Sequence, residues 1–415
     1  MTYWTEFRTH WPSLFGSALG IALGSALNHY MTNLFAPPLL AEFGWEKSQF
    51  ALVGTLGLIT MVFVPFAGRF TDRYGARTAA AVGFVALPFC FFAYSLMTGP
   101  IWQFFALSLV QHIFGVLTTT LVFSRVVVER FDLARGMALS LLMTGAPLAG
   151  AVLTPLIGQY IDEEGWRAGY RLMAGMSLVG GIVAVSLVGR RSAAAASHAR
   201  QPHGISRADL ISLLKHPSFL LIVAGMFFCN FPQIIVSSQL KLVLIENGAP
   251  GTLATWIVSL YAAGVIVGRF VSGIALDKVS PQLVAIVALG LPAVGFIAIA
   301  SPFNAAWVLA GSVLLIGLAQ GAEGDVGAYL TSRTFDLRHF SFIYSFLIAS
   351  MGIAMAVGSV VLSYTLHTTD RFDLFLILAA VLTIVGAACF FLTGRGGRGS
   401  PEAAATTSAP APEPA

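Results

Sequence analysis

Charged residues are scarce in this 415-residue sequence, where they make up 10% of the chain. Ordinary soluble domains contain about 25%. Hydrophobic residues make up 57%. A soluble fold of this length would have too few charges to cover its outside and too much apolar surface to bury. The composition therefore excludes a soluble enzyme and leaves a membrane protein, built either from helices or as an outer-membrane barrel.

Cysteine is also rare, with only Cys90, Cys229 and Cys389. All three lie within apolar runs without metal-ligand spacing, so we interpret them as packing residues and expect no metal and no cofactor. Nucleophile–base patterns and P-loop signatures are lacking, which argues against an enzyme and against nucleotide-driven transport. The net charge of +4 does not indicate nucleic acid, because the basic residues lie between apolar runs and form no patch.

Long apolar runs dominate what is present. Runs of about 20 residues, such as 172–189, have the length that a helix needs to cross a bilayer. Barrel strands would be about 10 residues long and alternate in polarity. We therefore expect an all-α integral membrane protein with twelve transmembrane helices. The expected spans are 13–36, 48–67, 78–97, 101–124, 136–160, 168–189, 217–240, 252–272, 280–300, 304–330, 340–365 and 373–393.

A polar stretch at 190–216 divides these spans into two sets of six. The sequence thus predicts an N-terminal six-helix bundle over 1–189, a cytoplasmic linker over 190–216 and a C-terminal six-helix bundle over 217–393. The tail, 394–415, is rich in glycine, alanine and proline, and we expect it to be disordered.

The connecting segments differ in their content of lysine and arginine. If both termini face the cytoplasm, the inside segments hold 18 of the 23 basic residues and the outside loops hold five. Acidic residues split nearly evenly. This distribution follows the positive-inside rule. We therefore expect both termini in the cytoplasm and the protein in a bacterial-type inner membrane.

Two short patterns recur at nearly one offset. Residues 68–73 (GRFTDR) and 273–278 (GIALDK) both read G-x-x-x-D-[RK] and lie 205 positions apart. The sequence FDL occurs at 131–133 and again at 335–337, an offset of 204. A duplication of parallel halves implies a pseudo-two-fold axis along the membrane normal and a substrate site near midplane between the halves.

On these motifs the chain resembles the major facilitator superfamily over about residues 13–393. Residues 68–77 (GRFTDRYGAR) match the family's loop signature, G-x-x-x-D-[RK]-x-G-x-[RK], at every fixed position. The second copy keeps Gly273, Asp277 and Lys278 but loses the later glycine and arginine. The resemblance implies secondary transport by alternating access, with these loops acting as cytoplasmic latches.

The latch also has a physical basis in its residues. A glycine lets helices approach closely, and Asp72 at a helix end can pair with Arg130 or Arg135 of a neighbouring loop. Asp277 has corresponding arginines after the tenth span. The alternative for the basic residues is that they only obey the orientation rule. The latch candidates are Gly68, Asp72, Arg73, Arg77, Arg130, Arg135, Gly273, Asp277, Lys278, Arg333 and Arg338.

Arg269 is expected inside the membrane, eight residues before Asp277. A charge at the bilayer centre costs about 2.5–3.5 kcal/mol on insertion scales, so it persists mainly where it is paired or useful. The spacing of Arg269, Gly273 and Asp277 resembles the eighth span of monocarboxylate and oxalate–formate transporters. The resemblance implies that Arg269 binds a substrate carboxylate, for which a guanidinium fork is well shaped. The alternatives are that it snorkels to the cytoplasm or pairs with a buried acid.

The likeness to the eukaryotic monocarboxylate carriers is incomplete. Those carriers place an aspartate one turn before the arginine, where this chain has Val265. They also open the first span with an acidic signature, and the segment 12–20 (PSLFGSALG) contains no acid. The resemblance is therefore to the broader bacterial carboxylate group, and proton coupling must be arranged differently.

Two acids of the tenth span, Glu323 and Asp325, are two positions apart and so point to different helix faces. One is the candidate counter-ion of Arg269. The other is the candidate proton carrier, because burial disfavours the charged form of a carboxyl group. The alternative is that the span ends early and both acids face the cytoplasm. The repeat argues against this, since Asp336 corresponds to Asp132 at the membrane surface.

Polar residues in the first, fourth, seventh and tenth spans complete the expected site. His29 titrates near neutral pH, and in this superfamily the first span lines the cavity. His29 would then bind substrate or carry a proton. An interhelical hydrogen bond is the alternative for each of these residues. The expected substrate-binding residues are Arg269, Asn28, His29, Tyr30, Asn33, Gln111, Asn230, Gln233 and Tyr329.

Two further features have two interpretations each. Arg125 is either a second anion anchor or the partner of Glu129 one turn on. The segment 143–158 (MTGAPLAGAVLTPLIG) resembles the glycine–proline motif of drug/proton antiporters, which hints at export. Packing of small residues along a kinked helix is the alternative.

The sequence thus predicts a monomeric, proton-linked importer of a small organic anion, a carboxylate, embedded in the lipid bilayer. An exporter or anion exchanger of the same fold is the second possibility.

Overall fold

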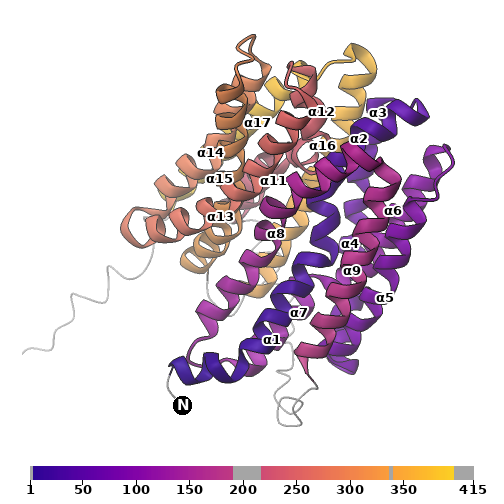
Figure 1. The fold of residues 1–415 in the computed structure, drawn as a ribbon. Coiled ribbons are helices and arrows are strands. Elements are labelled where there is room, and N and C mark those ends of the chain that lie inside the picture. Colours follow the sequence, from indigo (N-terminus) through magenta and orange to yellow (C-terminus); the bar gives the residue numbers. More distant parts are fainter. Residues whose placement is uncertain (1–2, 190–215, 336–339, 397–415) are drawn as a thin grey trace, which may run out of the picture.

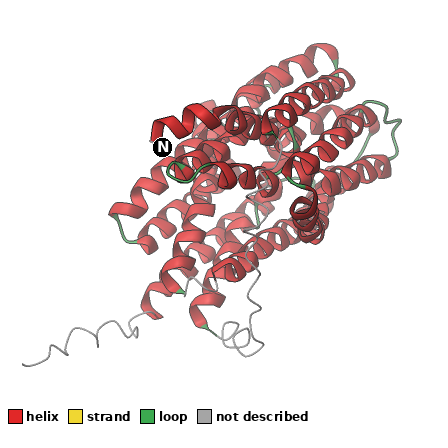
Figure 2. Ribbon diagram, turned by 90° about the horizontal axis from the view of Figure 1, so that it is seen from below, coloured by secondary structure: helices red, strands yellow, loops and turns green. Residues whose placement is uncertain are grey.

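The computed structural model describes residues 3–189, 216–335 and 340–396, and this part is almost entirely helical (Figures 1 and 2). The first half contains α1 Tyr3–Leu23, α2 Ser25–Phe43, α3 Lys47–Ala51, η1 Leu52–Leu56, α4 Gly57–Tyr74, α5 Ala76–Tyr94, α6 Ile101–Gly115, η2 Val116–Thr118, α7 Thr120–Arg130, α8 Arg135–Glu164 and α9 Trp166–Val188. The second half contains α11 Pro217–Asn230, η4 Ile235–Gln239, α12 Leu240–Glu246, α13 Gly251–Lys278, α14 Pro281–Ala300, α15 Ala306–Thr334, α16 Phe340–Thr369 and α17 Asp373–Gly396.

Eleven helices of the described part are long and apolar enough to cross a membrane, counting directly continuous elements as one helix. They correspond to the second through twelfth expected spans. The first expected span, 13–36, is not one continuous helix, because α1 and α2 are separated at Gly24. The expected linker lies, apart from His216, outside the described residues, as do residues 397–415 of the expected tail.

The break at Gly24 has a tertiary cause. The Thr118 hydroxyl accepts a hydrogen bond from the backbone N–H of Ser25 at 2.9 Å. A Cβ at Gly24 would overlap that threonine, so only glycine permits the approach. The broken first span therefore packs against η2, the short 3-10 turn in the fourth span.

Successive turns lie alternately at the two ends of the bundle. We call the end that holds the N-terminus the proximal end and the opposite end, where α3 and α12 lie, the distal end (Figure 1). Turns at 44–46, 95–100, 247–250 and 370–372 are distal. The first and the last described helices accordingly both have their free ends at the proximal end.

The helices form two groups that lie side by side, one from each half of the chain (Figure 1). One hydrophobic cluster belongs to the first half and includes Phe84 and Phe123, and another belongs to the second half and includes Phe219 and Phe390. The largest cluster contains residues of both halves and joins them.

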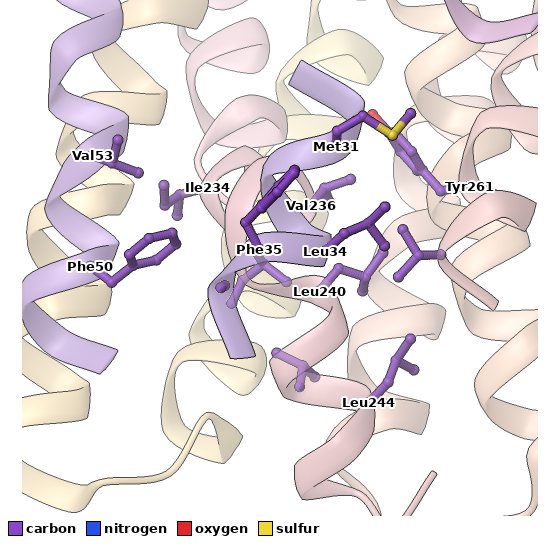
Figure 3. Close-up of a cluster of buried hydrophobic side chains, with 14 of the residues drawn as sticks. Met31, Leu34, Phe35, Phe50, Val53, Ile234, Val236, Leu240, Leu244 and Tyr261 are labelled. Carbon is purple, nitrogen blue, oxygen red and sulfur yellow. The ribbon is translucent and has the colours of Figure 1, made fainter. Parts of the chain in front are cut away.

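Helix α2 carries the centre of this joint cluster. Figure 3 shows Met31, Leu34 and Phe35 of α2 between Phe50 and Val53 of the first half and side chains of the second half. The residues from the second half include Ile234, Val236, Leu240 and Tyr261. Apolar contact between the halves is therefore concentrated around α2 and towards the distal end.

Candidate functional site

A cavity of about 580 Å³ lies between α8 of the first half and α13, α15 and α16 of the second half. We call it the arginine pocket, because Arg269 is part of its wall. Asp277, Asp325 and Tyr344 also line it, as do Ser140 and Thr144 from α8. The pocket therefore contains a cation, two acids and several hydroxyl groups at the junction of the halves.

Arg269 is only loosely paired in this pocket. Its Nε lies 3.8 Å from Oδ2 of Asp325, which is an ion-pair distance too long for a hydrogen bond. The same Nε is buried and has no hydrogen-bond partner among the described residues. The side chain of Arg269 is 27% exposed. The guanidinium thus keeps hydrogen-bonding capacity available for a ligand.

Glycines explain how α13 and α15 bring these two residues together. A Cβ at Gly268 would overlap the Leu318 carbonyl, and a Cβ at Gly321 would overlap the Val265 carbonyl and the backbone nitrogen of Arg269. Without side chains at these positions the two backbones can touch. The close helix contact expected from the glycines of the tenth span is therefore present, and it sets Asp325 beside Arg269.

Glu323 lies on a different face of α15 and is buried at 4% exposure. It accepts hydrogen bonds from the side-chain amides of Asn230 and Gln320, the latter at 2.7 Å. Gln233 lines the same small cavity of about 30 Å³. Because α15 continues to Thr334, the two acids lie within the helix and the alternative of an early end to the tenth span is wrong.

A second polar cavity, of about 290 Å³, lies between α2, α4 and α6 of the first half and η4 and α16 of the second. We call it the histidine pocket, because His29 and His112 both line it. Asn28 and Gln111 line it as well. His29 is exposed to solvent-sized space, and its ring meets Tyr30 edge-on at 5.2 Å between centroids.

The expected substrate-binding residues fall into two groups. Arg269, Asn28, His29 and Gln111 line one of the two polar pockets. Tyr30, Asn33, Asn230, Gln233 and Tyr329 are not among the lining residues of either pocket. Tyr30 packs on Tyr261 across the halves with ring centroids 6.3 Å apart. Substrate contact by the second group stays a prediction.

The expected partners of Asp72 are corrected by the structure. Asp72 pairs with Arg125 of α7, and not with Arg130 or Arg135. It lies on the last turn of α4, which faces α7 instead of the following loop. Arg125 is accordingly paired with Asp72, and the expected partner Glu129 forms no printed ion pair with it. The latch role of Asp72 stays a prediction.

The arginines that were expected to hold Asp72 bind elsewhere. Arg130 donates to the Ser13 hydroxyl and, at 2.5 Å, to the Val188 carbonyl at the end of α9. Exposed carbonyls at a helix C-terminus attract cations. Arg135 pairs with Asp132 at 2.7 Å. Both arginines thus serve contacts within the first half.

Other latch residues have varied surroundings. A Cβ at Gly68 or Gly273 would meet no atom within 4 Å, so the close helix approach expected there is absent from this conformation. Arg73 lies over the Tyr74 ring, 5.4 Å from its centroid. Arg77 lines a separate cavity near the start of α5, and Lys278 ends α13. The side chain of Arg333 and the whole of Arg338 lie outside the described residues.

Sequence reasoning missed the polar contacts that join the halves at the distal end. Lys47 bonds to Glu246 at 2.9 Å and to the Asp370 carbonyl at 3.2 Å. Lys241, which is 3% exposed, lies 3.7 Å from Asp162. Both lysines had only been counted as outside basic residues. No local signal reveals which acids a fold will bring to them.

Asn33 makes the most buried of these distal contacts. Its amide nitrogen donates to the Val236 carbonyl at 2.6 Å, and its oxygen accepts from the Leu240 N–H at 2.7 Å. Both partners belong to the π-helical segment η4 or to the residue after it. π-Helical turns are frequent at functional sites. Asn33 thus joins α2 to the irregular part of the seventh span.

A family comparison agrees with this architecture. The model of the Major Facilitator Superfamily matches residues 18–243 and 223–413. These ranges cover nearly the whole chain and include every helix that lines the two pockets.

Curated relatives are transporters of several kinds. The chain is 26% identical to a 3-(3-hydroxy-phenyl)propionate transporter of Escherichia coli strain K12, over 81% of each chain. It is 27% identical to monocarboxylate transporter 4 of Rattus norvegicus, over 66% of this chain and 59% of the relative. It is 24% identical to an agnestins efflux protein of Paecilomyces divaricatus, over 76% of this chain and 71% of the relative.

Among solved structures, the fold is similar to that of a bacterial homologue of the human lysosomal transporter Spinster in an inward-facing, unoccupied conformation. The TM-score is 0.70 at 12% identity, and the match covers 95% of this chain and 98% of the other. With the helical bundle, the family match and these relatives together, the chain belongs to the major facilitator superfamily and is a multi-pass membrane transporter, not an enzyme.

Proposed function

We propose that the protein is a secondary active transporter that takes up a small carboxylate together with a proton. The observation that carries this proposal is Arg269 in the wall of a 580 Å³ cavity between the halves, with a loose ion pair and an unpartnered Nε. A carboxylate accepts two parallel hydrogen bonds from a guanidinium fork, which gives both strength and orientation.

The coupling mechanism follows from competition for Arg269. Asp325 is the built-in carboxylate of the pocket, and a substrate carboxylate would take its place beside the guanidinium. Two like charges near one cation repel each other, so a proton on Asp325 favours substrate binding. A proton and an anion would then load together, which is the requirement for symport.

Glu323 is the second candidate for the coupling proton. It is buried among neutral amides of Asn230 and Gln320, and a carboxyl group in such surroundings can exist in either charge state. A proton on Glu323 would remove a buried charge from the second half. The two candidates make different predictions for substrate affinity, which are set out in the Discussion.

Alternating access would use the contacts between the halves. In the described conformation these contacts concentrate at the distal end, while each half has its own hydrophobic cluster elsewhere. We assign the distal end to the outside and the proximal end to the cytoplasm of a bacterial-type inner membrane. Transport would require the distal contacts to open as the proximal ends close. We propose a monomer as the transporting unit.

Two relatives support the substrate class. The names of monocarboxylate transporter 4 and of the 3-(3-hydroxy-phenyl)propionate transporter both specify carboxylates. The agnestins efflux protein instead supports the second candidate, an exporter or exchanger of the same fold. The glycines of the 143–158 segment do not add to that support. A Cβ at Gly150 would overlap Tyr30 and a Cβ at Gly158 would overlap Thr255, so packing accounts for these two positions.

Transport by the full-length protein in proteoliposomes tests the proposal. With an inward proton gradient, radiolabelled carboxylate should accumulate, and Arg269→Lys should lower the rate at least tenfold, because an ammonium cannot form the bidentate pair. Arg371→Lys is the matched control, since Arg371 pairs with Asp373 at the distal surface. Near-normal uptake by Arg269→Lys would contradict the assignment. Accumulation only with the gradient reversed would establish the exporter.

A further inference from the structure

The histidine pocket contains hydrogen-bonding groups that the carboxylate mechanism does not use. Its lining in the described part of the chain includes no lysine, arginine, aspartate or glutamate. Neutral polar side chains from both halves take their place, among them Thr60, Gln111 and Ser238. A pocket of this composition offers no charge to an anion, but it is suited to a neutral polar group.

Two polar atoms in its wall lack a partner. Nε2 of Gln111 and Oγ1 of Thr60 are buried and have no hydrogen-bond partner among the described residues. The other end of the Gln111 amide is occupied, because Oε1 accepts a hydrogen bond from the Tyr94 hydroxyl at 2.9 Å. Buried polar groups in proteins are nearly always hydrogen-bonded. A ligand that supplies the missing partners would gain what the fold has left unsatisfied.

His112 contributes an acceptor of fixed position. Its Nδ1 lies 2.7 Å from the Ser108 carbonyl. A carbonyl oxygen can only accept, so Nδ1 carries the proton and Nε2 of the neutral ring carries the lone pair. The pocket thus combines the Gln111 amide as a donor, His112 Nε2 as an acceptor and the Thr60 hydroxyl as either. A hydroxyl group, which donates one hydrogen bond and accepts others, complements this set.

We infer that the histidine pocket is the subsite for a hydroxyl group of the transported anion, so that the substrates are hydroxylated carboxylates. The inference rests on the proposed function in one respect, namely that Arg269 holds the carboxylate end. Gln111, Thr60 and His112 then determine specificity for the other end. A carboxylate without a hydroxyl would leave Gln111 Nε2 and Thr60 Oγ1 unpaired, and so would bind less tightly.

Binding of matched ligand pairs to the purified full-length protein tests this subsite. The pairs are butyrate with hydroxybutyrate, succinate with malate and benzoate with hydroxybenzoate, measured by calorimetry. For at least one pair the hydroxylated member should bind about tenfold more tightly or better, the worth of one or more net hydrogen bonds. Thr60→Val keeps the side-chain shape and should reduce that preference severalfold. It should not destabilise the protein, because the hydroxyl it removes has no partner.

Two further variants complete the experiment. Thr55→Val is the matched control, since the Thr55 hydroxyl donates to the Leu52 carbonyl and Thr55 is not in the pocket lining, so the preference should stay unchanged. Gln111→Met removes the unpaired donor and should also reduce the preference. If Thr60→Val and Gln111→Met both keep the full preference, the inference is overturned.

The remaining outcomes separate this inference from the proposed function. Equal binding of both members of every pair, with binding lost in Arg269→Lys, would overturn the hydroxyl subsite and leave the carboxylate site intact. A hydroxyl preference that survives Arg269→Lys, with butanol-type alcohols competing, would contradict the carboxylate site and leave the subsite intact. Failure of every pair to bind would overturn both.

Discussion

At the scale of the single residue, the two acids of α15 differ in their surroundings. Asp325 faces Arg269 across a polar cavity, whereas Glu323 is enclosed by the amides of Asn230 and Gln320. The helix separates them because they are two positions apart. Substrate binding at Arg269 should therefore respond directly to Asp325 and only indirectly to Glu323.

Asp325→Asn tests the competition for Arg269. In the unchanged protein, protonation of Asp325 as the pH falls should tighten substrate binding. The amide variant is neutral at every pH, so it should bind substrate at neutral pH about as tightly as the unchanged protein does at low pH. Calorimetric titrations from pH 5 to 8 would measure this. A steep pH dependence that remains in the variant would place the titrating group elsewhere.

Glu323→Gln tests the second proton candidate. If Glu323 carries the coupling proton, the variant should retain substrate exchange across the membrane but lose accumulation driven by a proton gradient. Counterflow and gradient-driven uptake in the same proteoliposomes separate the two activities. Unchanged accumulation would remove Glu323 from the coupling mechanism.

Residue-level prediction from sequence reached as far as helix geometry allows. The different faces of Glu323 and Asp325 follow from their spacing alone, and the pairing of one acid with Arg269 was foreseen. The partner of Asp72 was not, because it depends on how α4 and α7 are rotated against each other. The unpaired atoms of Gln111 and Thr60 were also invisible, since only the folded environment shows that a polar atom lacks a partner.

At the scale of the element, the contact between α13 and α15 sets the position of Arg269. Gly321→Ala should displace the backbone near Arg269, because the new methyl group would overlap two backbone atoms. Overpacking of this kind destabilises by about 1–3 kcal/mol. The variant should lower both the melting temperature and the substrate affinity. Gly324→Ala, three residues on in open space, is the control and should change neither by a comparable amount.

The N-terminal end of α1 supports the start of α8. Glu6 accepts hydrogen bonds from the backbone N–H groups of Asp132 and Ala134 at 2.6 and 2.8 Å. These bonds, with Asp132 contributing most, lower the pKa of Glu6, which lies outside the expected span. A carboxylate at a helix N-terminus is also favoured by the helix dipole.

The lowered pKa of Glu6 gives a stability prediction with a definite sign. The folded state favours the ionised form, so the stabilisation is complete above the ordinary carboxyl pKa and is lost as the pH falls below that range. The melting temperatures of the unchanged protein and Glu6→Gln should differ at neutral pH and converge on acidification. Glu164→Gln, at the exposed far end of α8, should show no such pattern. A constant difference at all pH values would contradict this account.

Hydropathy located the helices well because membrane spans are a local property of sequence. The break at Gly24 was missed for a physical reason. Glycines also occur at Gly16 and Gly20, and their spacing reads as a helix-packing face. What converts Gly24 into a break is Thr118, which is distant in sequence.

At the scale of the whole molecule, the distal ion pairs hold the two halves together in the described conformation. Lys47→Glu places like charges beside Glu246 and Asp370 and should shift the population towards opening at the distal end. Partly exposed pairs contribute about 0.2–1 kcal/mol, so the shift should be at most about fivefold. Labelling of single cysteines introduced near the distal turns would report it.

A charge exchange provides the control for this experiment. Lys47→Glu combined with Glu246→Lys restores opposite charges at the same place and should recover much of the closed population. Equal labelling of the single variant, the double variant and the unchanged protein would show that the ion pair does not contribute to closure.

The duplication visible in the sequence was enough to suggest two similar halves and a site between them. It was not enough to predict the distal contacts. One sequence must serve every conformation of a transport cycle, so contacts that exist in only one conformation leave no periodic trace. Lys47, Lys241 and Asn33 are residues of this kind.

The break at Gly24 divides the first span between two mechanical roles. Helix α1 contributes Leu14 and Ile21 to the cluster of the first half, whereas α2 adheres to the second half through Asn33 and its apolar neighbours. A rocking motion of one half against the other would load the chain at the joint between these two helices. There the regular helical pattern is already interrupted, so bending would stretch few backbone hydrogen bonds. The resistance to motion, and hence its rate, would then be governed by the grip of α2 on its neighbours.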